Sequence, residues 1–278
     1  MGRAVMQDGG VLRWMRVVIA LSLTLVLGVS TVAGEYLLKP SMAFAPGALL
    51  VMLVFAYGWP RLTDSPQPRA TSIMLALLGM AGVGATMLAE ATPFLEWLPT
   101  LVGVGLLWAF VQNLTRGVGA SHATVNVSAQ VAGLAITLSA ATWVAAFRLT
   151  TDHTTILVGL VAVVLALAAT ALPWPARYTS PIAVVAGAVG GLITVLVVGG
   201  TSPVFILSGA LGAIMGVLAA AVDRLLGLIA QSKYQAAALS DARRRDKARL
   251  FAVHASLGAA PIALGGVIVY VLTRVVAM

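Results

Sequence analysis

The chain has 278 residues, of which 60% are hydrophobic and only 9% are charged, and its mean hydropathy is +1.01. These values exclude a water-soluble globular domain, because such domains carry about 25% charged residues. The net charge of +8 does not indicate nucleic-acid binding, since the basic residues lie in short segments between apolar runs and lack interleaved aromatic residues. The absence of cysteine excludes disulfides, thiolate metal sites and cysteine nucleophiles.

Nine apolar runs follow one another along the chain, and each is long enough to cross a hydrocarbon core as a helix. Short polar segments such as "WPRLTDSPQPR" separate them. The sequence therefore predicts an all-α fold, a polytopic transmembrane helix bundle of about nine spans that forms one domain over residues 1–278. The predicted spans are 17–34, 42–59, 71–89, 96–113, 123–147, 154–173, 181–200, 203–230 and 251–273.

The first span also resembles a secretory signal, because Arg13 and Arg16 precede it and the small-residue stretch "VSTVAGE" follows it. Its apolar run is long for a signal sequence, so we expect a retained signal anchor behind a cytoplasmic tail of residues 1–16. Cleavage would leave the remaining topology unchanged.

The distribution of basic residues predicts the orientation of the bundle. If the N-terminus is cytoplasmic and the spans alternate, only Lys39, Arg148 and Arg274 of the 17 Lys and Arg residues fall outside. This bias follows the positive-inside rule and places the C-terminus on the extracytoplasmic side. The high content of Ala, Val, Gly and Arg is typical of a GC-rich bacterium, so we expect a multi-pass protein of the plasma membrane.

A polar stripe enters the fifth span. His122, Asn126 and Gln130 are four residues apart and share one helix face, with Gln130 about 12 Å along the axis from His122. An unpaired amide in hydrocarbon costs several kcal/mol, so this face must meet other helices or a water-filled cavity. Two interpretations stay open: the amides tie helices together, or the stripe lines a substrate cavity that opens to the cytoplasm.

Further ionisable residues lie in the eighth and ninth spans. Asp223 and Arg224 are adjacent, so on a helix they point about 100° apart and must find separate partners. His254 begins the last span, which also contains Pro261. We predict a substrate-binding site formed where these helices meet, from Arg116, His122, Asn126, Gln130, Asp223 and His254.

Small residues form a stripe on the eighth span, at Ser208, Gly212, Gly216 and Ala220, and Gly187 and Gly191 do so on the seventh. Such stripes let helix backbones approach closely. The stripe predicts that the eighth span lies in the interior of the bundle. Asp223 precedes the next stripe position by one residue and is therefore expected to be buried beside the same neighbour.

A basic segment separates the last two spans. An Ala-rich run, "YQAAALSDA", predicts that the eighth helix continues into the cytoplasm, before a basic loop of about 231–250. Basic residues beside a membrane attract anionic lipid headgroups at about 1 kcal/mol per charge, in addition to enforcing topology. We expect headgroup contacts from Arg243, Arg244, Arg245, Lys247 and Arg249.

Three classes of function fit this inventory, and a transporter or permease fits best. It would move a lipid-linked or small polar substrate across the plasma membrane, with Asp223 as the carboxylate available for ion coupling. An integral-membrane enzyme acting on a lipid or lipid-linked phosphate at the cytoplasmic face would use Arg116 and Arg224 to hold phosphate and His122, His254 or Asp223 as a base. A non-catalytic subunit of a cell-envelope complex would need no site.

We expect no enzymatic activity, although an enzyme is the second interpretation. No nucleotide-binding loop, HExxH motif or carboxylate cluster is present in the sequence, so we expect neither a metal nor a cofactor. The expected partners are membrane lipids and either a membrane protein or a second copy of the chain, and no nucleic acid.

Overall fold

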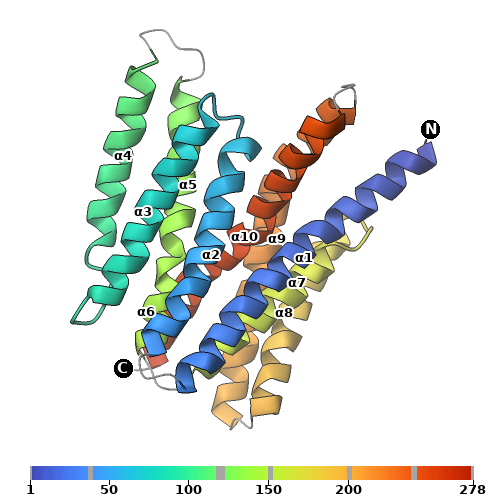
Figure 1. Cartoon of the computed structure of the whole chain (residues 1–278). Helices are drawn as coiled ribbons and strands as arrows, with labels where there is room; N and C mark the ends of the chain where they lie inside the picture. Colours follow the sequence, from blue (N-terminus) through green and yellow to red (C-terminus); the bar gives the residue numbers. More distant parts are fainter. Residues whose placement is uncertain are drawn as a thin grey trace.

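A computed structural model gives the architecture of the chain (Figure 1). It describes residues 2–36, 40–116, 123–149, 153–198, 202–238 and 243–276. Within these ranges the chain forms ten helices and no strands. The helices are α1 (Gly2–Tyr36), α2 (Pro40–Leu62), α3 (Pro68–Leu88), α4 (Leu98–Leu114), α5 (Ala123–Ser139), α6 (Ala141–Leu149), α7 (Thr154–Thr170), α8 (Ala176–Val198), α9 (Ser202–Ala238) and α10 (Arg243–Val276).

Seven of the described segments are long and apolar enough to cross a membrane, and the architecture is therefore that of a helical membrane bundle. The apolar helices α4 and α7 are shorter, with 17 residues each, or about 25 Å at 1.5 Å per residue. Each of the nine predicted spans overlaps one of these nine segments. The start of α1 and the end of α10 lie at opposite ends of the bundle (Figure 1), as an odd number of crossings requires.

The helices form two groups with α10 between them. α3 and α5 each pack on α2 and α4, and α7, α8 and α9 form a second group; α1 packs on α2 of the first group and on α7 of the second (Figure 1). α10 contacts α2 and α6 on one side and α1 and α9 on the other. It is correspondingly one of the two most enclosed spans, with 72% of its most apolar window buried.

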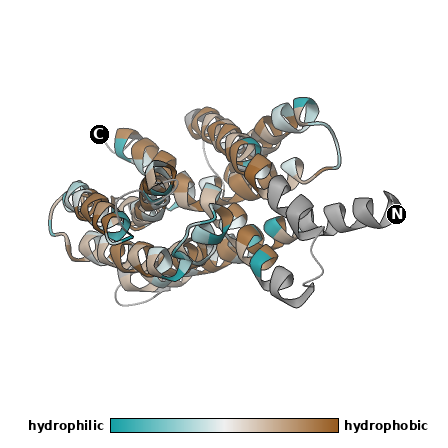
Figure 2. Ribbon diagram, turned by 90° about the horizontal axis from the view of Figure 1, so that it is seen from above, coloured by the Kyte–Doolittle hydropathy of each residue, from teal (hydrophilic) through white to brown (hydrophobic). Residues whose placement is uncertain are grey.

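Large apolar side chains cover the outside of the bundle as well as its core. Leu88, Val197 and Ile206 are 82%, 81% and 77% exposed. Figure 2 shows hydrophobic residues along helices throughout the bundle. A soluble protein rarely exposes so many large apolar side chains. The exposed apolar surface of this bundle is suited to contact with lipid acyl chains.

The fifth span is broken, whereas the sequence predicts one continuous helix over 123–147. The break is at Ala140, whose N–H donates to Thr137 O at 3.2 Å, while Trp143 N–H donates to Ala140 O at 3.3 Å. Both bonds span three residues instead of the four of an α-helix. Thr137 and Ser139 also donate their hydroxyls to carbonyls one turn earlier, which competes with the backbone ladder and bends helices.

The small-residue stripes bring α8 and α9 into direct backbone contact. A β-carbon added at Gly187 would lie 2.2 Å from Gly212 O, and one at Gly191 would lie 2.2 Å from Ser208 O. The predicted close packing is therefore confirmed, but the predicted interior position of this span is wrong. Only 39% of the α9 window is buried, because the stripe occupies one face and residues such as Ile206 cover another.

The basic segment between the last two spans is mostly helical. α9 continues to Ala238, eight residues past the end of its apolar window at Ala230, as the Ala-rich run predicts. α10 begins at Arg243, so the predicted loop of 231–250 contains the ends of two helices. The side chains of Arg243, Arg244, Arg245 and Lys247 lie outside those that the structure describes.

Candidate functional site

The polar stripe of α5 is buried against α3 and α4. Asn126 Nδ2 donates to Asn113 Oδ1 at 2.7 Å, and Asn113 Nδ2 donates to Gln130 Oε1 at 3.1 Å. Gln130 is 1% exposed and donates its own amide to Thr71 Oγ1 at 3.1 Å. The helices α3, α4 and α5 are thus joined by side chains. We call the following residues the amide cluster: Ser65, Thr71, Gln112, Asn113, Asn126 and Gln130.

The turn between α2 and α3 completes the amide cluster. Ser65 Oγ lies 3.0 Å from Thr71 Oγ1 and donates to Asn126 Oδ1 at 3.4 Å. Gln112 Nε2 donates to Thr71 Oγ1 at 3.3 Å, which makes Thr71 the shared partner of three side chains. The predicted site omitted Ser65, Thr71, Gln112 and Asn113, and the available signal was the pair Gln112–Asn113 at the end of an apolar run.

Trp59 closes the deeper side of the amide cluster. Its indole N–H donates to Ala129 O at 2.8 Å. Gly133 continues the polar stripe, and a β-carbon there would lie 2.4 Å from Trp59 Nε1, so only glycine lets the indole reach α5. One turn further, Thr137 donates to Gly133 O within α5. The stripe is therefore filled by protein side chains over its whole described length.

Arg116 lies at the outer edge of the amide cluster. Its Nη1 donates to Asn113 Oδ1 at 3.4 Å, which adds a charged donor to an oxygen that already accepts from Asn126. His122, the first residue of the predicted stripe, lies outside the described residues.

A separate charged group links α1, α7 and α9. Arg16 Nη1 forms an ion pair with Asp223 Oδ1, and Arg16 Nη2 donates to Thr170 O at 3.1 Å and to Thr170 Oγ1 at 3.4 Å. The Arg16 and Asp223 side chains are only 11% and 22% exposed. Arg16, Thr170 and Asp223 are called the charge cluster below. Both charged residues lie inside apolar windows, Trp14–Ala33 and Val204–Ala230.

The neighbour Arg224 contacts a different helix. Its Nε donates to Ser180 Oγ at 2.8 Å and its Nη2 donates to Ala176 O at 3.1 Å, both on α8. The two adjacent residues thus have separate partners, as the 100° rotation between them requires. The expectation that Asp223 lies beside α8 is wrong, because Arg224 faces α8 and Asp223 faces α1.

His254 lies near the charge cluster, at the start of the last span. It is 2% exposed, and its Nδ1 donates to Leu250 O at 2.6 Å within α10. α1 crosses α10 one turn later, where a β-carbon at Gly258 would lie 2.7 Å from Arg16 O. The backbone of α1 at Arg16 therefore passes α10 one turn from His254.

The structure distributes the predicted site over two clusters. Asn126 and Gln130 belong to the amide cluster and Arg116 contacts it, whereas Asp223 belongs to the charge cluster and His254 lies one turn from the α1–α10 crossing at Arg16. Among the described residues, no group of three or more His, Asp or Glu side chains comes together in a way that could hold a metal ion. No protein-family model, curated protein or solved structure matches this chain.

Proposed function

We propose that the chain is a permease-type transporter that moves a small polar or lipid-linked substrate across the plasma membrane, and that Asp223 couples an ion to this movement. The charge cluster carries the proposal. Ionisable residues within membrane spans are rare and costly, and they mark substrate paths, ion sites and proton relays. Arg16 and Asp223 lie 207 positions apart in the chain and still pair between two apolar spans.

The surroundings of the pair suit a moving contact. α1 and α9 each pack on α7 and α10, and the Arg16–Asp223 ion pair adds a direct link between them. Neutralising Asp223 would release Arg16 from α9 and leave it bonded to α7 through Thr170 O. An ion that binds or leaves at Asp223 would thereby change how α1 is held against α9, which is the kind of two-state contact that transport needs.

The broken fifth span and the amide cluster also support the transport proposal. Interrupted helices at membrane depth are tolerated where they are enclosed by protein, and many transporters place such breaks near the substrate path. The residues at this break, Ala140 and Trp143, are fully buried. The amide cluster ties α3, α4 and α5 into one unit, against which α7, α8 and α9 would move, with the Arg16–Asp223 pair as the changing contact to α1. A substrate-binding role for Asn126 and Gln130 stays a prediction.

The orientation is part of the proposal: the N-terminus is cytoplasmic and the C-terminus is extracytoplasmic. Because the chain contains no cysteine, single exposed cysteines can be introduced without removing others. Two such variants are Arg69→Cys, at the start of α3, and Glu96→Cys, in the turn between α3 and α4. We expect a membrane-impermeant maleimide to label only Glu96→Cys in intact cells and both variants in lysed membranes. Labelling of Arg69→Cys in intact cells would reverse the orientation.

The function of the charge cluster is tested by removing both charges together. A single substitution leaves one buried charge unpaired and lowers stability, whereas a double neutral replacement is often tolerated. We therefore expect Arg16→Met with Asp223→Leu to reach normal membrane abundance but to fail to rescue the phenotype of a deletion strain. Arg224→Met is the matched control, because it removes the adjacent charge, and it should rescue.

The alternative result would favour a non-catalytic membrane subunit. The amide cluster supports this second candidate, since its donors are used within the protein as a structural tie requires. Rescue by the double neutral variant would show that the ion pair serves only packing, and the transport proposal would then fail. No observation favours the enzyme, because Arg116 and Arg224 lie in different contacts and do not face one phosphate.

A further inference from the structure

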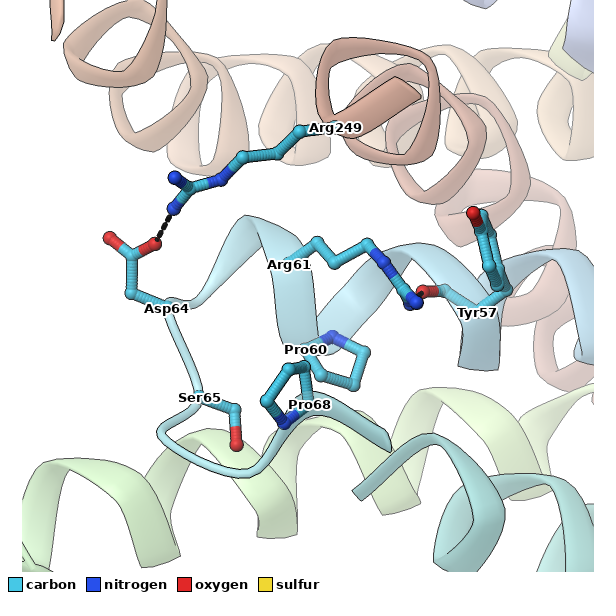
Figure 3. A pocket seen from close by; sticks show the side chains of 7 residues that line it. All are labelled: Tyr57, Pro60, Arg61, Asp64, Ser65, Pro68 and Arg249. Carbon is cyan, nitrogen blue, oxygen red and sulfur yellow. Dashed lines mark hydrogen bonds and ion pairs between the residues drawn. The ribbon is translucent and has the colours of Figure 1, made fainter. Parts of the chain in front are cut away.

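A pocket of about 350 Å³ lies where the end of α2, the α2–α3 turn and the start of α10 meet (Figure 3). Arg61, Asp64 and Ser65 contribute to it from the α2 side, and Arg249 contributes from α10. Arg61 lies in the last turn of α2, and Arg249 is the first residue of the final apolar window. The pocket is therefore located at the end of two spans, at the level where lipid headgroups meet water.

The pocket carries more positive than negative charge. Arg249 forms an ion pair with Asp64, and their side chains are 55% and 52% exposed. Arg61 stacks over the Tyr57 ring at 4.0 Å and donates to Tyr57 O. Figure 3 shows Arg249 reaching Asp64 on one side of the pocket and Arg61 reaching Tyr57 on the other. Two guanidinium groups and one carboxylate thus line the same pocket, and only the Arg249 guanidinium is paired with the carboxylate.

Three features of this pocket suit an anionic phosphate ester. Guanidinium groups match the geometry of phosphate oxygens through paired N–H donors. Pro60 and Pro68 also line the pocket and offer an apolar wall for the ester group. The α10 residues that precede Arg249, at 243–247, have the sequence RRRDK, which is net positive.

We propose that this pocket binds an anionic phosphate ester through Arg249 and Arg61, and that the phosphate replaces Asp64 as the partner of Arg249. Asp64 then acts as an internal competitor that holds Arg249 in place when the pocket is empty. The exposure of the ion pair allows this exchange, because an exposed pair contributes little to stability and is readily broken. Binding here does not depend on the transport proposal, because it requires only the pocket.

The test uses the full-length protein purified in an uncharged detergent, titrated with dioctanoyl phosphatidylglycerol and followed by native mass spectrometry. We expect Arg61→Gln with Arg249→Gln to weaken binding at least about tenfold, because charge-assisted hydrogen bonds are lost. Asp64→Asn should tighten binding by about two- to fivefold, the worth of an exposed ion pair. Dioctanoyl phosphatidylcholine, which carries no net charge, should bind more weakly than phosphatidylglycerol.

Arg177→Gln provides a matched control. Arg177 also stacks on a tyrosine, 4.8 Å from the Tyr178 ring, but it does not line the pocket, so its removal should leave binding unchanged. Competition by glycerol 3-phosphate or inorganic phosphate with the same dependence on Arg249 would support the site and identify a soluble ligand. Failure of these anions to compete would assign it to a lipid headgroup.

Several results would overturn the proposal. Weaker binding by Asp64→Asn would show that the carboxylate is not a competitor for Arg249. Equal binding by the double arginine variant and the wild type, or by the two lipids, would show that no anion is recognised in the pocket. The unfolding midpoints of all variants are measured as a control, and equal midpoints would show that a change in lipid binding does not reflect a change in folding.

Discussion

Replacement of Gly212 by alanine tests the close contact between α8 and α9. The added β-carbon would lie 2.2 Å from Gly187 O, whereas ordinary van der Waals contact begins at 3.4 Å. The obstructing atom is backbone, so it cannot move aside as a flexible side chain would, and the two helices must separate by about 1 Å. In a membrane, helix association depends on such packing, and we expect a loss of about 2 kcal/mol in the free energy of unfolding.

The measurement is equilibrium unfolding by sodium dodecyl sulfate in mixed micelles, followed by circular dichroism. Gly103→Ala on α4 is the matched control, because nothing lies within 4 Å of its added β-carbon. It should be neutral or stabilising by about 0.5 kcal/mol, since alanine favours the helix more than glycine does. If Gly212→Ala unfolds like Gly103→Ala, the backbones of α8 and α9 are not in contact and the reasoning fails.

Two further substitutions test the polar contacts inside the bundle. Gln130→Leu should cost about 1–2 kcal/mol in the same titration, because it removes the Gln130 hydrogen bonds to Thr71 on α3 and Asn113 on α4. Ser139→Ala loses only a bond within α5 and should change stability by less than about 0.5 kcal/mol. Trp143→Phe should cost about 1–3 kcal/mol, because Ile262 O accepts from the Trp143 indole at 2.7 Å and would lose this donor. Trp174→Phe is the control and should have no effect, since Trp174 is exposed. Equal effects of the two tryptophan changes would contradict the buried bond.

Hydrophobic patterning predicted the spans because lipid enforces helices wherever the chain is long and apolar. It also predicted that Asn126 and Gln130 face other helices or a water-filled cavity and not lipid, since an amide has no partner among acyl chains. The partners could not be identified in the same way. Thr71 and Ser65 are ordinary residues at the end of a helix and in a turn, and only the packing of α3 against α5 brings them to the amides.

Arg16 shows why the charge cluster escaped prediction. Its position before an apolar run suggested a flanking charge that sets topology, and nothing in its spacing relates it to Asp223. The break at Ala140 was missed for a related reason, because no proline or glycine interrupts the sequence there and the cause lies in hydroxyl bonding to the preceding turn. Long-range pairing and local competition for carbonyls are both invisible to hydropathy.

The central position of α10 has a consequence for how the protein is made. α10 is the last of these helices to leave the ribosome, yet it contacts both helix groups. The contacts are close: a β-carbon at Gly58 on α2 would lie 2.2 Å from Ala252 O on α10, and the α1 backbone passes close to Gly258 on α10. The nine helices synthesised before it are already inserted while their shared neighbour is still missing. Assembly of the bundle is therefore completed only after translation of α10, and a nascent chain stalled before that point exposes two half-built groups to membrane quality control.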